Sequence, residues 1–197
     1  ILLAGLHADG QTVVAEPFRS RDHTERMLEY LGANIHVQEN TVKISRSNLV
    51  SRPINVPGDI SSAAFFMVAG AVVPGSDITI ENVGLNPTRT GIIDVLERMG
   101  ADISIQNERL DCNEPVGDVR VRYSDLKGIT LEGEIIPRII DELPVIAVAA
   151  TQAKGETVVR DAQELRKKES DRIAAVCKEF SKLGAEFQER VDGFVVN

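Results

Sequence analysis

Leu31-Gly32-Ala33 recurs as Met99-Gly100-Ala101 and again as Leu183-Gly184-Ala185, each time at the end of a charged, amphipathic stretch. Before each of these stretches stands a glycine followed by a β-branched run, at residues 10–14, 75–80 and 155–159. Each run is itself preceded by an apolar segment rich in small residues, at 1–8, 62–73 and 143–153. This order, found three times, indicates three copies of one structural unit.

The chemistry of each segment predicts the shape of the unit. The first segment is apolar on all faces, so as a helix it must be buried, and the glycine after it ends the helix. The β-branched run is typical of a strand, and the amphipathic stretch predicts a second helix that ends at the second glycine. Another strand follows at 34–37, 102–105 and 186–188. Because one such unit cannot bury its own apolar faces, we predict an α/β fold with several units around a shared axis, apolar helices inside and sheets outside.

Helical spacing also predicts the buried side of each amphipathic helix. The expected apolar faces are Met27, Leu28 and Leu31 in the first copy, Ile92, Ile93, Leu96 and Met99 in the second, and Ile173, Val176, Phe180 and Leu183 in the third. The stretch from 106 to 142 is less regular and contains strand-like segments at 119–123 and 129–131.

Composition excludes several classes of protein. With 43% hydrophobic and 26% charged residues, the 197-residue chain has the ordinary globular mixture. Aromatic residues are 4% and the net charge is −8, so we expect no nucleic-acid binding by base stacking or by a bulk positive field. The apolar run at 1–6 is too short for a membrane span. The two cysteines and three histidines lack metal-ligand spacing, so we expect no metal site and a cytoplasmic location.

The densest charged cluster is residues 166–172, at the expected start of the third amphipathic helix. On a helix, Lys168 and Arg172 stand at i,i+4 and Glu169 and Arg172 at i,i+3, so the three head groups would share one edge. Such a group could hold an anion and transfer a proton. The alternative is an ordinary solvated helix face.

Three further polar groups stand at expected helix starts, and each has a purely structural alternative. Ser20 and Arg21 could receive a phosphate, although Asp22 with Glu25 also fits a capping box. Asp141, which with Glu142 directly precedes an apolar helix, could orient a hydroxyl or take its proton, or could simply cap the helix. Asn86 before Pro87 fits a helix N-cap. The polar group at 58–63 fits another N-cap or the wall of a cleft at a crossing between modules, where two prolines and a glycine interrupt the chain.

Four of these motifs stand in an order that resembles the 5-enolpyruvylshikimate-3-phosphate synthase (EPSP synthase) family, in particular its class II bacterial type. They are residues 58–65 (GDISSAAF), 86–91 (NPTRTG), 140–144 (IDELP) and 168–172 (KESDR). The resemblance covers essentially the whole chain and implies an inside-out α/β barrel of repeated βαβαββ units, in two domains. It implies that residues 1–57 are the last unit of one domain and that 58–197 are two units of the other.

The resemblance also implies a reaction and its residues. The enolpyruvyl group of phosphoenolpyruvate would move to the 5-hydroxyl of shikimate 3-phosphate, with no cofactor. Asp141 would hold the acceptor hydroxyls and serve as a candidate base, and Glu169 would be the proton-transfer carboxylate. Lys168 would contact the reacting hydroxyl and Arg172 would bind phosphoenolpyruvate. Further acceptor contacts would come from Ser20, Arg21 and, as a weaker match, Glu164.

Other parts of the family pattern are absent from this sequence. These are a Lys-Ser pair expected just before Ile1, early basic residues, and later arginine and lysine sites. We therefore expect the chain to be an internal segment of a longer protein, to be inactive alone, and to have the rest of its own two-domain chain as its partner. Two alternatives stay open: an enolpyruvyl transferase that acts on UDP-N-acetylglucosamine, and a noncatalytic scaffold or binding module.

Overall fold

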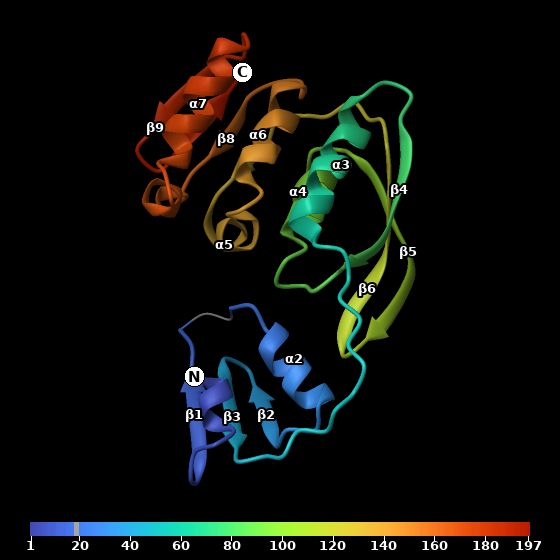
Figure 1. The fold of residues 1–197 in the computed structure, drawn as a ribbon. Coiled ribbons are helices and arrows are strands. Elements are labelled where there is room, and N and C mark those ends of the chain that lie inside the picture. Colours follow the sequence, from blue (N-terminus) through green and yellow to red (C-terminus); the bar gives the residue numbers. More distant parts are fainter. Residues whose placement is uncertain (18–19) are drawn as a thin grey trace.

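The computed structural model describes residues 1–17 and 20–197, which form two bodies joined by an extended segment (Figure 1). The smaller body is built from a three-stranded antiparallel sheet in the order β1-β3-β2 and from two helices. Its buried centre consists of Leu6, Leu28 and Ile44. The elements are α1 (Leu2–Gly5), β1 (Gln11–Ala15), α2 (His23–Tyr30), β2 (Ile35–Gln38) and β3 (Thr41–Ser45).

The larger body contains two sheets and most of the helices. One sheet has the order β4-β6-β5 and the other β7-β8-β10-β9, in which β7 and β8 are parallel. Its helices are α3 (Ile60–Val72), α4 (Gly91–Arg98), α5 (Ile136–Ile139), α6 (Leu143–Thr151) and α7 (Arg172–Lys182), with short 3₁₀ turns η1 (Gly133–Ile135) and η2 (Gln163–Lys167). Its strands are β4 (Asp77–Gly84), β5 (Asp102–Asp111), β6 (Glu114–Arg122), β7 (Thr130–Leu131), β8 (Thr157–Val159), β9 (Phe187–Arg190) and β10 (Gly193–Val196).

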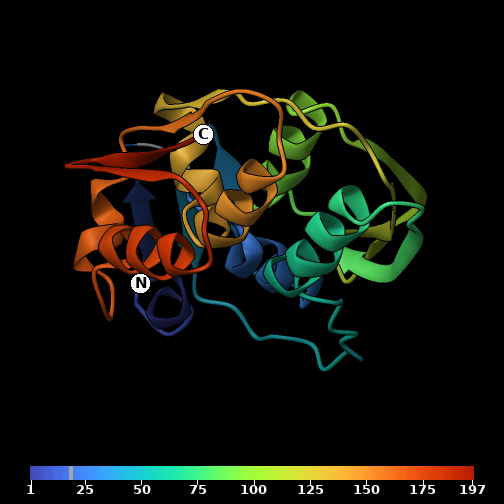
Figure 2. The same ribbon diagram turned by 90° about the horizontal axis from the view of Figure 1, so that it is seen from above.

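The two apolar helices lie in the middle of the larger body, between the two sheets (Figure 2). Helix α3 packs against β4 and β6 on one side and against α6 on the other, and α6 also packs against β10. One continuous core runs through this body, with Met67, Leu96, Ile146 and Phe194 among its fully buried members. The larger body is therefore α/β with the apolar helices inside and the sheets outside, as the sequence predicts. In the first copy the prediction of a buried helix over 1–8 is wrong. Helix α1 spans only Leu2–Gly5 and packs on one sheet, which leaves Ile1 85% and Leu3 59% exposed.

Six glycines show that the unit is repeated. Gly10, Gly75 and Gly155, before the first strand of each copy, have φ of 84°, 80° and 88°. The glycines that end the amphipathic helices, Gly32, Gly100 and Gly184, have φ of 85°, 94° and 92°. A side chain with a β-carbon is strained at such angles, which explains why the same residue stands at the same two places of each copy. The prediction of three related units is confirmed.

Two predicted faces differ from the structure. The face of α4 is buried as expected, whereas Leu183 is 83% exposed and Cys177 is buried on α7 in its place. Leu183, the C-cap of α7, borders an open groove with Val148 and Phe180 instead of the core. Met27 of α2 is 38% exposed because Leu28 alone in that helix is buried against the small sheet.

The apolar helices are not covered on every side either. Phe65 and Phe66 of α3 are 64% and 62% exposed. The expectation of complete burial assumed several units around one axis, whereas in the larger body α3 packs mainly against α6 and the β4-β6-β5 sheet.

The joining segment is fixed where it enters the larger body. The Gly58 N–H donates to the Asn82 carbonyl at 2.7 Å, and the Gly84 N–H donates to the Gly58 carbonyl at 2.9 Å. Asn82 has φ of 57° at a bulge of β4, which places its carbonyl toward the crossing chain. The assignment of residues 1–57 and 58–197 to two enolpyruvyl transferase domains stays a prediction.

Candidate active site

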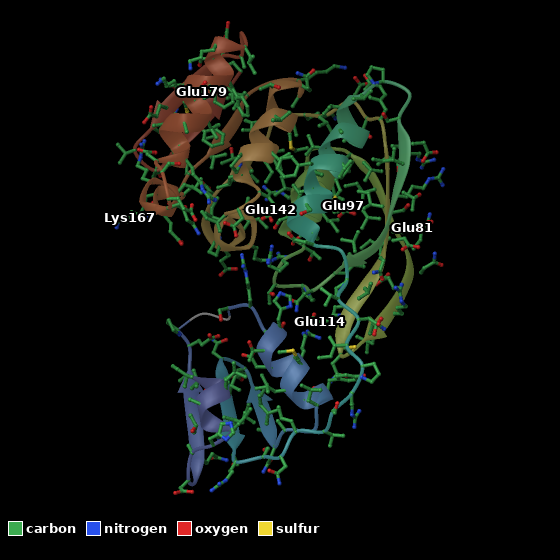
Figure 3. All side chains as sticks on the ribbon, viewed as in Figure 1. Glu81, Glu97, Glu114, Glu142, Lys167 and Glu179 are labelled. Carbon is green, nitrogen blue, oxygen red and sulfur yellow. The ribbon has the colours of Figure 1, made fainter. Side chains whose placement is uncertain are left out.

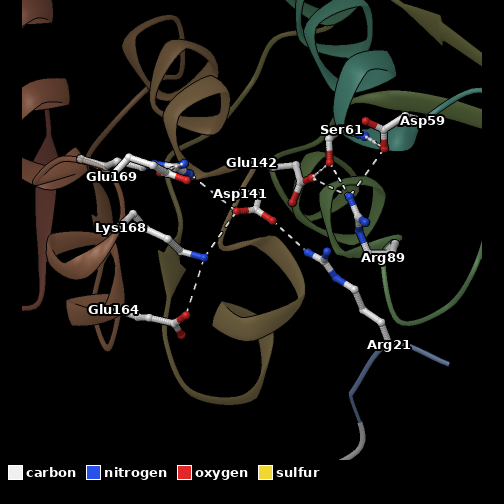
Figure 4. Close-up of polar contacts among 10 residues, drawn as sticks. Arg21, Asp59, Ser61, Arg89, Asp141, Glu142, Glu164, Lys168 and Glu169 are labelled. Carbon is white, nitrogen blue, oxygen red and sulfur yellow. Dashed lines mark hydrogen bonds and ion pairs between the residues drawn. The ribbon is translucent and has the colours of Figure 1, made fainter. Parts of the chain in front are cut away.

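Asp141 lies at the centre of a charged cluster that joins the two bodies (Figure 4). Arg21, from the segment before α2, donates from Nη2 to Asp141 Oδ2 at 2.8 Å. On the other side, Lys168 Nζ and Arg172 Nη1 lie 3.7 and 3.6 Å from Asp141 Oδ1. Residues that are far apart in the sequence, 21, 141 and 168–172, thus meet at one carboxylate.

This surrounding fixes the charge of Asp141. Burial acts to raise the pKa of Asp141, but the hydrogen bond from Arg21 and the charges of Lys168 and Arg172 outweigh it, so the pKa lies below its ordinary value. Asp141 is therefore an anion at neutral pH. In this arrangement it is a good hydrogen-bond acceptor for a hydroxyl and a weak base.

Lys168 reaches Asp141 from the turn before α7, whereas Arg172 is the first residue of that helix. The prediction that residues 168–172 share a helix edge is wrong, because α7 begins only at Arg172. Asp171 is the N-cap and accepts from the Ala174 N–H at 3.0 Å, so the helix cannot start earlier. Lys168 still lies 3.6 Å from Glu164 Oε1, since η2 brings these two residues together.

Glu169 lies at the outer edge of the cluster. Its carboxylate accepts from Arg172 Nη2 at 2.6 Å and is 81% exposed. Hydrogen bonds from its own backbone N–H and from Arg172 hold the pKa of Glu169 below its usual range. It therefore stands charged in solvent, one residue from the lysine and in contact with the arginine that flank Asp141.

A cleft of about 980 Å³ opens beside Arg21, between the two bodies. Its walls include Ser20, Arg26 and Arg138, so three arginines, counting Arg21, face this space. The Ser20 hydroxyl donates to Glu16 Oε1 at 2.6 Å and so lies at the rim without touching Asp141. Of the predicted site residues, Arg21, Asp141, Glu164, Lys168, Glu169 and Arg172 are brought together and Ser20 adjoins them.

The capping box predicted at Asp22 and Glu25 is wrong. In the part of the chain that the structure describes, Asp22 makes no side-chain hydrogen bond to the start of α2. Asp22 Oδ1 instead accepts from Arg26 Nε at 2.9 Å and from Asn86 Nδ2 at 2.6 Å. Asn86 is itself buried, and its contact with Asp22, the residue after Arg21, joins the two bodies.

Two other predicted caps also differ. The N-cap of α4 is Thr90, and Asn86 instead accepts from the Thr88 N–H at 2.9 Å within the preceding turn. The N-cap of α6 is Glu142 rather than Asp141. The cap at Asp59 is confirmed, since Asp59 Oδ1 accepts from the Ser61 N–H at 3.1 Å at the start of α3.

A second polar cluster is built on Glu142, the residue that follows Asp141 in the sequence. Glu142 is 97% buried by side chain, and its Oε1 accepts a short hydrogen bond from Ser61 and lies 3.9 Å from Arg89 Nη2. Arg89 also donates to the Ser61 hydroxyl at 2.5 Å. Sequence reasoning missed this cluster. The available signal was that a charged residue next to an all-apolar helix is buried only if it finds a partner.

The cluster around Asp141 is suited to bind anions that carry hydroxyl groups. Three cations can receive phosphate or carboxylate groups, Asp141 can accept from a hydroxyl, and Glu169 can exchange a proton with solvent. Among the described residues, there is no group of three or more His, Cys, Asp or Glu residues that could hold a metal ion. Within the same ranges, the helices are too short or too polar for any to cross a membrane.

Comparison with known proteins places this geometry in context. A family model described as EPSP synthase (3-phosphoshikimate 1-carboxyvinyltransferase) matches residues 1–197. The 3-phosphoshikimate 1-carboxyvinyltransferase of Geobacillus kaustophilus is 58% identical over 197 residues, which are 100% of this chain and 46% of that protein. The protein of the same name from Gloeothece citriformis is 55% identical over 199 residues, 100% of this chain and 44% of that protein. The chain thus spans less than half the length of the curated relatives it matches.

Solved structures agree with these matches. EPSP synthase from Acinetobacter baumannii superposes with a TM-score of 0.95 at 45% identity, covering 100% of this chain and 44% of that one. The enolpyruvyl transferase NikO from Streptomyces tendae covers the same shares with a TM-score of 0.72 at 20% identity. The latter similarity shows the fold alone.

Proposed function

Because this chain belongs to the EPSP synthase family, we propose that the whole protein transfers the enolpyruvyl group of phosphoenolpyruvate to the 5-hydroxyl of shikimate 3-phosphate. In this step the 5-hydroxyl gives its proton to a base, for which Asp141 is the candidate, and its oxygen bonds to the central carbon of phosphoenolpyruvate while the methylene carbon of phosphoenolpyruvate gains a proton. The tetrahedral intermediate then loses phosphate and a methyl proton. The observation that carries the proposal is the meeting of Arg21, Lys168 and Arg172 at Asp141.

The geometry suggests a division of roles. Arg21, from the smaller body, would bind the phosphate of shikimate 3-phosphate, with Ser20 at the rim and Glu164 beside Lys168. Asp141 and Lys168 would hold the reacting hydroxyl. Arg172 would bind phosphoenolpyruvate, and Glu169, which contacts Arg172 at 2.6 Å, would transfer the proton at the methylene. Residues 1–57 and 58–197 would then belong to two domains that close on the substrates.

Because Arg21 contacts Asp141, binding of the acceptor to Arg21 would also change the pKa of Asp141. A phosphate that binds Arg21 competes with Asp141 for its guanidinium. When the 2.8 Å hydrogen bond is lost, one of the causes that depress the pKa of Asp141 is removed. Asp141 would therefore become a better base when the acceptor is bound.

The alternatives receive less support. The likeness to the enolpyruvyl transferase from Streptomyces tendae extends to the fold alone, so no observation favours a nucleotide-sugar acceptor. A noncatalytic scaffold does not require three cations at one carboxylate. We further propose that the whole protein is a cytoplasmic enzyme of aromatic amino-acid biosynthesis.

The acceptor can be tested by calorimetry with the whole protein and shikimate 3-phosphate. Arg21→Ala should weaken binding about 10- to 100-fold, since hydrogen bonds to charged groups contribute about 1.5–3 kcal/mol. Arg160→Ala is a matched control, because Arg160 is 50% exposed against 49% for Arg21 and also has one carboxylate partner. Equal affinities in the two variants would contradict the role of Arg21, and no binding by the unmodified protein would contradict the proposed function.

A further inference from the structure

Glu142 is a buried carboxylate next to the most important residue of the site. Only 3% of its side chain is exposed, whereas 32% of Asp141 is. Figure 3 shows Glu142 inside the larger body, in the region between α6 and α3, while Glu81 and Glu179 lie on its outside. A carboxylate is costly to bury unless it is paired and hydrogen-bonded, so the burial of Glu142 depends on its partners.

Those partners come from two other elements. Ser61 is in the first turn of α3 and donates to Glu142 Oε1. Arg89, in the turn before α4, lies 3.9 Å from the same oxygen and donates to the Ser61 hydroxyl at 2.5 Å. Arg89 also lies 3.6 Å from Asp59 Oδ1, at the N-cap of α3. The first residues of α3 and α6 and the turn at 89 are therefore joined through Glu142.

The two neighbouring carboxylates have different surroundings. Asp141 extends to Arg21, Lys168 and Arg172, and Glu142 extends to Ser61 and Arg89 (Figure 4). The cations around Asp141 are long side chains that are 26–49% exposed. Such side chains can change rotamer when the carboxylate moves, so they hold its position only weakly. The buried contacts of Glu142 hold the backbone from which Asp141 projects.

We propose that Glu142, held by Ser61 and Arg89, is a positioning residue that sets the place of Asp141 among Arg21, Lys168 and Arg172. The inference rests on the proposed function, because Asp141 is taken to hold the acceptor hydroxyl. A buried, paired Glu142 prevents the start of α6 from shifting when substrate draws on Asp141. Geometry errors of about 1 Å at a reacting group can lower a rate about 100-fold.

A double-mutant cycle with the whole protein tests this inference. The variants are Glu142→Ala, Asp141→Ala and the double variant, and the measurements are the affinity for shikimate 3-phosphate by calorimetry and the turnover number. Glu142→Ala should lower turnover about 10- to 100-fold and weaken acceptor binding. In the Asp141→Ala background it should have almost no further effect on either quantity, because a positioning residue acts through the group it positions.

Two more variants separate positioning from general damage. Glu142→Gln keeps an oxygen that accepts from Ser61, so it should recover most of the turnover that Glu142→Ala loses. Asp118→Ala is the control: Asp118 accepts from the Asn82 N–H at 2.8 Å and from Asn107 at 2.7 Å, away from the site. Its effect should be small and the same with or without Asp141.

The outcomes are distinct. Effects of Glu142→Ala and Asp141→Ala that simply multiply would overturn the inference, as would a Glu142→Gln variant no better than Glu142→Ala. If Glu142→Ala fails to fold, the same cycle with Ser61→Ala in place of Glu142→Ala decides the question. An unmodified protein that neither binds shikimate 3-phosphate nor turns over would overturn the proposed function itself, and this inference with it.

Discussion

Removal of the Arg89 guanidinium, as in Arg89→Met, should strongly destabilise the larger body. Methionine fills much of the same space, but it leaves the carboxylate of Glu142 buried without a cation. The Arg89 Nη2 lies 3.9 Å from Glu142 Oε1, a separation at which two unit charges attract by about 4 kcal/mol at an effective dielectric of 20. Loss of one partner of a buried ion pair typically lowers the free energy of unfolding by about 3–5 kcal/mol, which agrees with this attraction energy.

The assay is urea unfolding of the chain at pH 7, followed by circular dichroism. For an m-value of about 2 kcal/mol per M, the expected loss lowers the transition midpoint by about 2 M. Hydrogen exchange of the α3 and α6 amides would assign the loss to the larger body. The double variant Arg89→Met/Glu142→Gln should recover much of the stability, because it removes the unpaired charge as well.

An exposed pair provides the comparison. Arg160 Nη1 lies 3.2 Å from Glu132, and both side chains are about half exposed. Arg160→Met should therefore cost at most about 1 kcal/mol. If Arg89→Met costs no more than Arg160→Met, or if the double variant is no more stable than Arg89→Met, the reasoning from a buried charge is refuted.

Other predictions concern the cluster itself. Glu169→Gln should lower turnover of the whole protein about 100- to 10,000-fold with little change in acceptor affinity. Its control is Glu179→Gln, which breaks a similar i,i+3 pair with Lys182 on α7 and should leave turnover within threefold. Equal rates for the two variants would make Glu169 a surface charge. Arg21→Ala should raise the pKa of Asp141, and NMR titration of the carboxyl carbon measures it. Because the pKa of Asp141 is depressed in the folded state, its contribution to stability is present above the ordinary value of about 3.9 and is lost as the pH falls through the lower folded value. Arg21→Ala should reduce this acid-dependent loss, and an unchanged titration would contradict the stated cause.

The repeated unit was predictable because each of its signals is local. Helical and strand periodicities act over a few residues, and the two glycines of each copy occupy φ values that a β-carbon disfavours. The same locality explains the error at 168–172, where Asp171 caps the helix and Arg172 begins it. An i,i+4 spacing cannot distinguish a helix from the turn before it.

The partners of polar side chains were harder to predict because they lie far along the chain. Arg21 and Asp141 are 120 residues apart, and Ser61 and Glu142 are 81 apart. The resemblance named Arg21 and Asp141 by their motifs, but nothing local to Asp22 indicates that it bonds Asn86 instead of capping α2. The different partners of Asp141 and Glu142 likewise follow from the packing of α6 on α3, which two adjacent acidic residues do not indicate.

The most direct test of the proposed chemistry is phosphate release from phosphoenolpyruvate by the whole protein, measured with each of two acceptors. The arrangement of Arg21, Lys168 and Arg172 about Asp141 predicts steady release with shikimate 3-phosphate and none with UDP-N-acetylglucosamine or without an acceptor. Equal release with the nucleotide sugar, or no release with shikimate 3-phosphate, would contradict the assignment of this site.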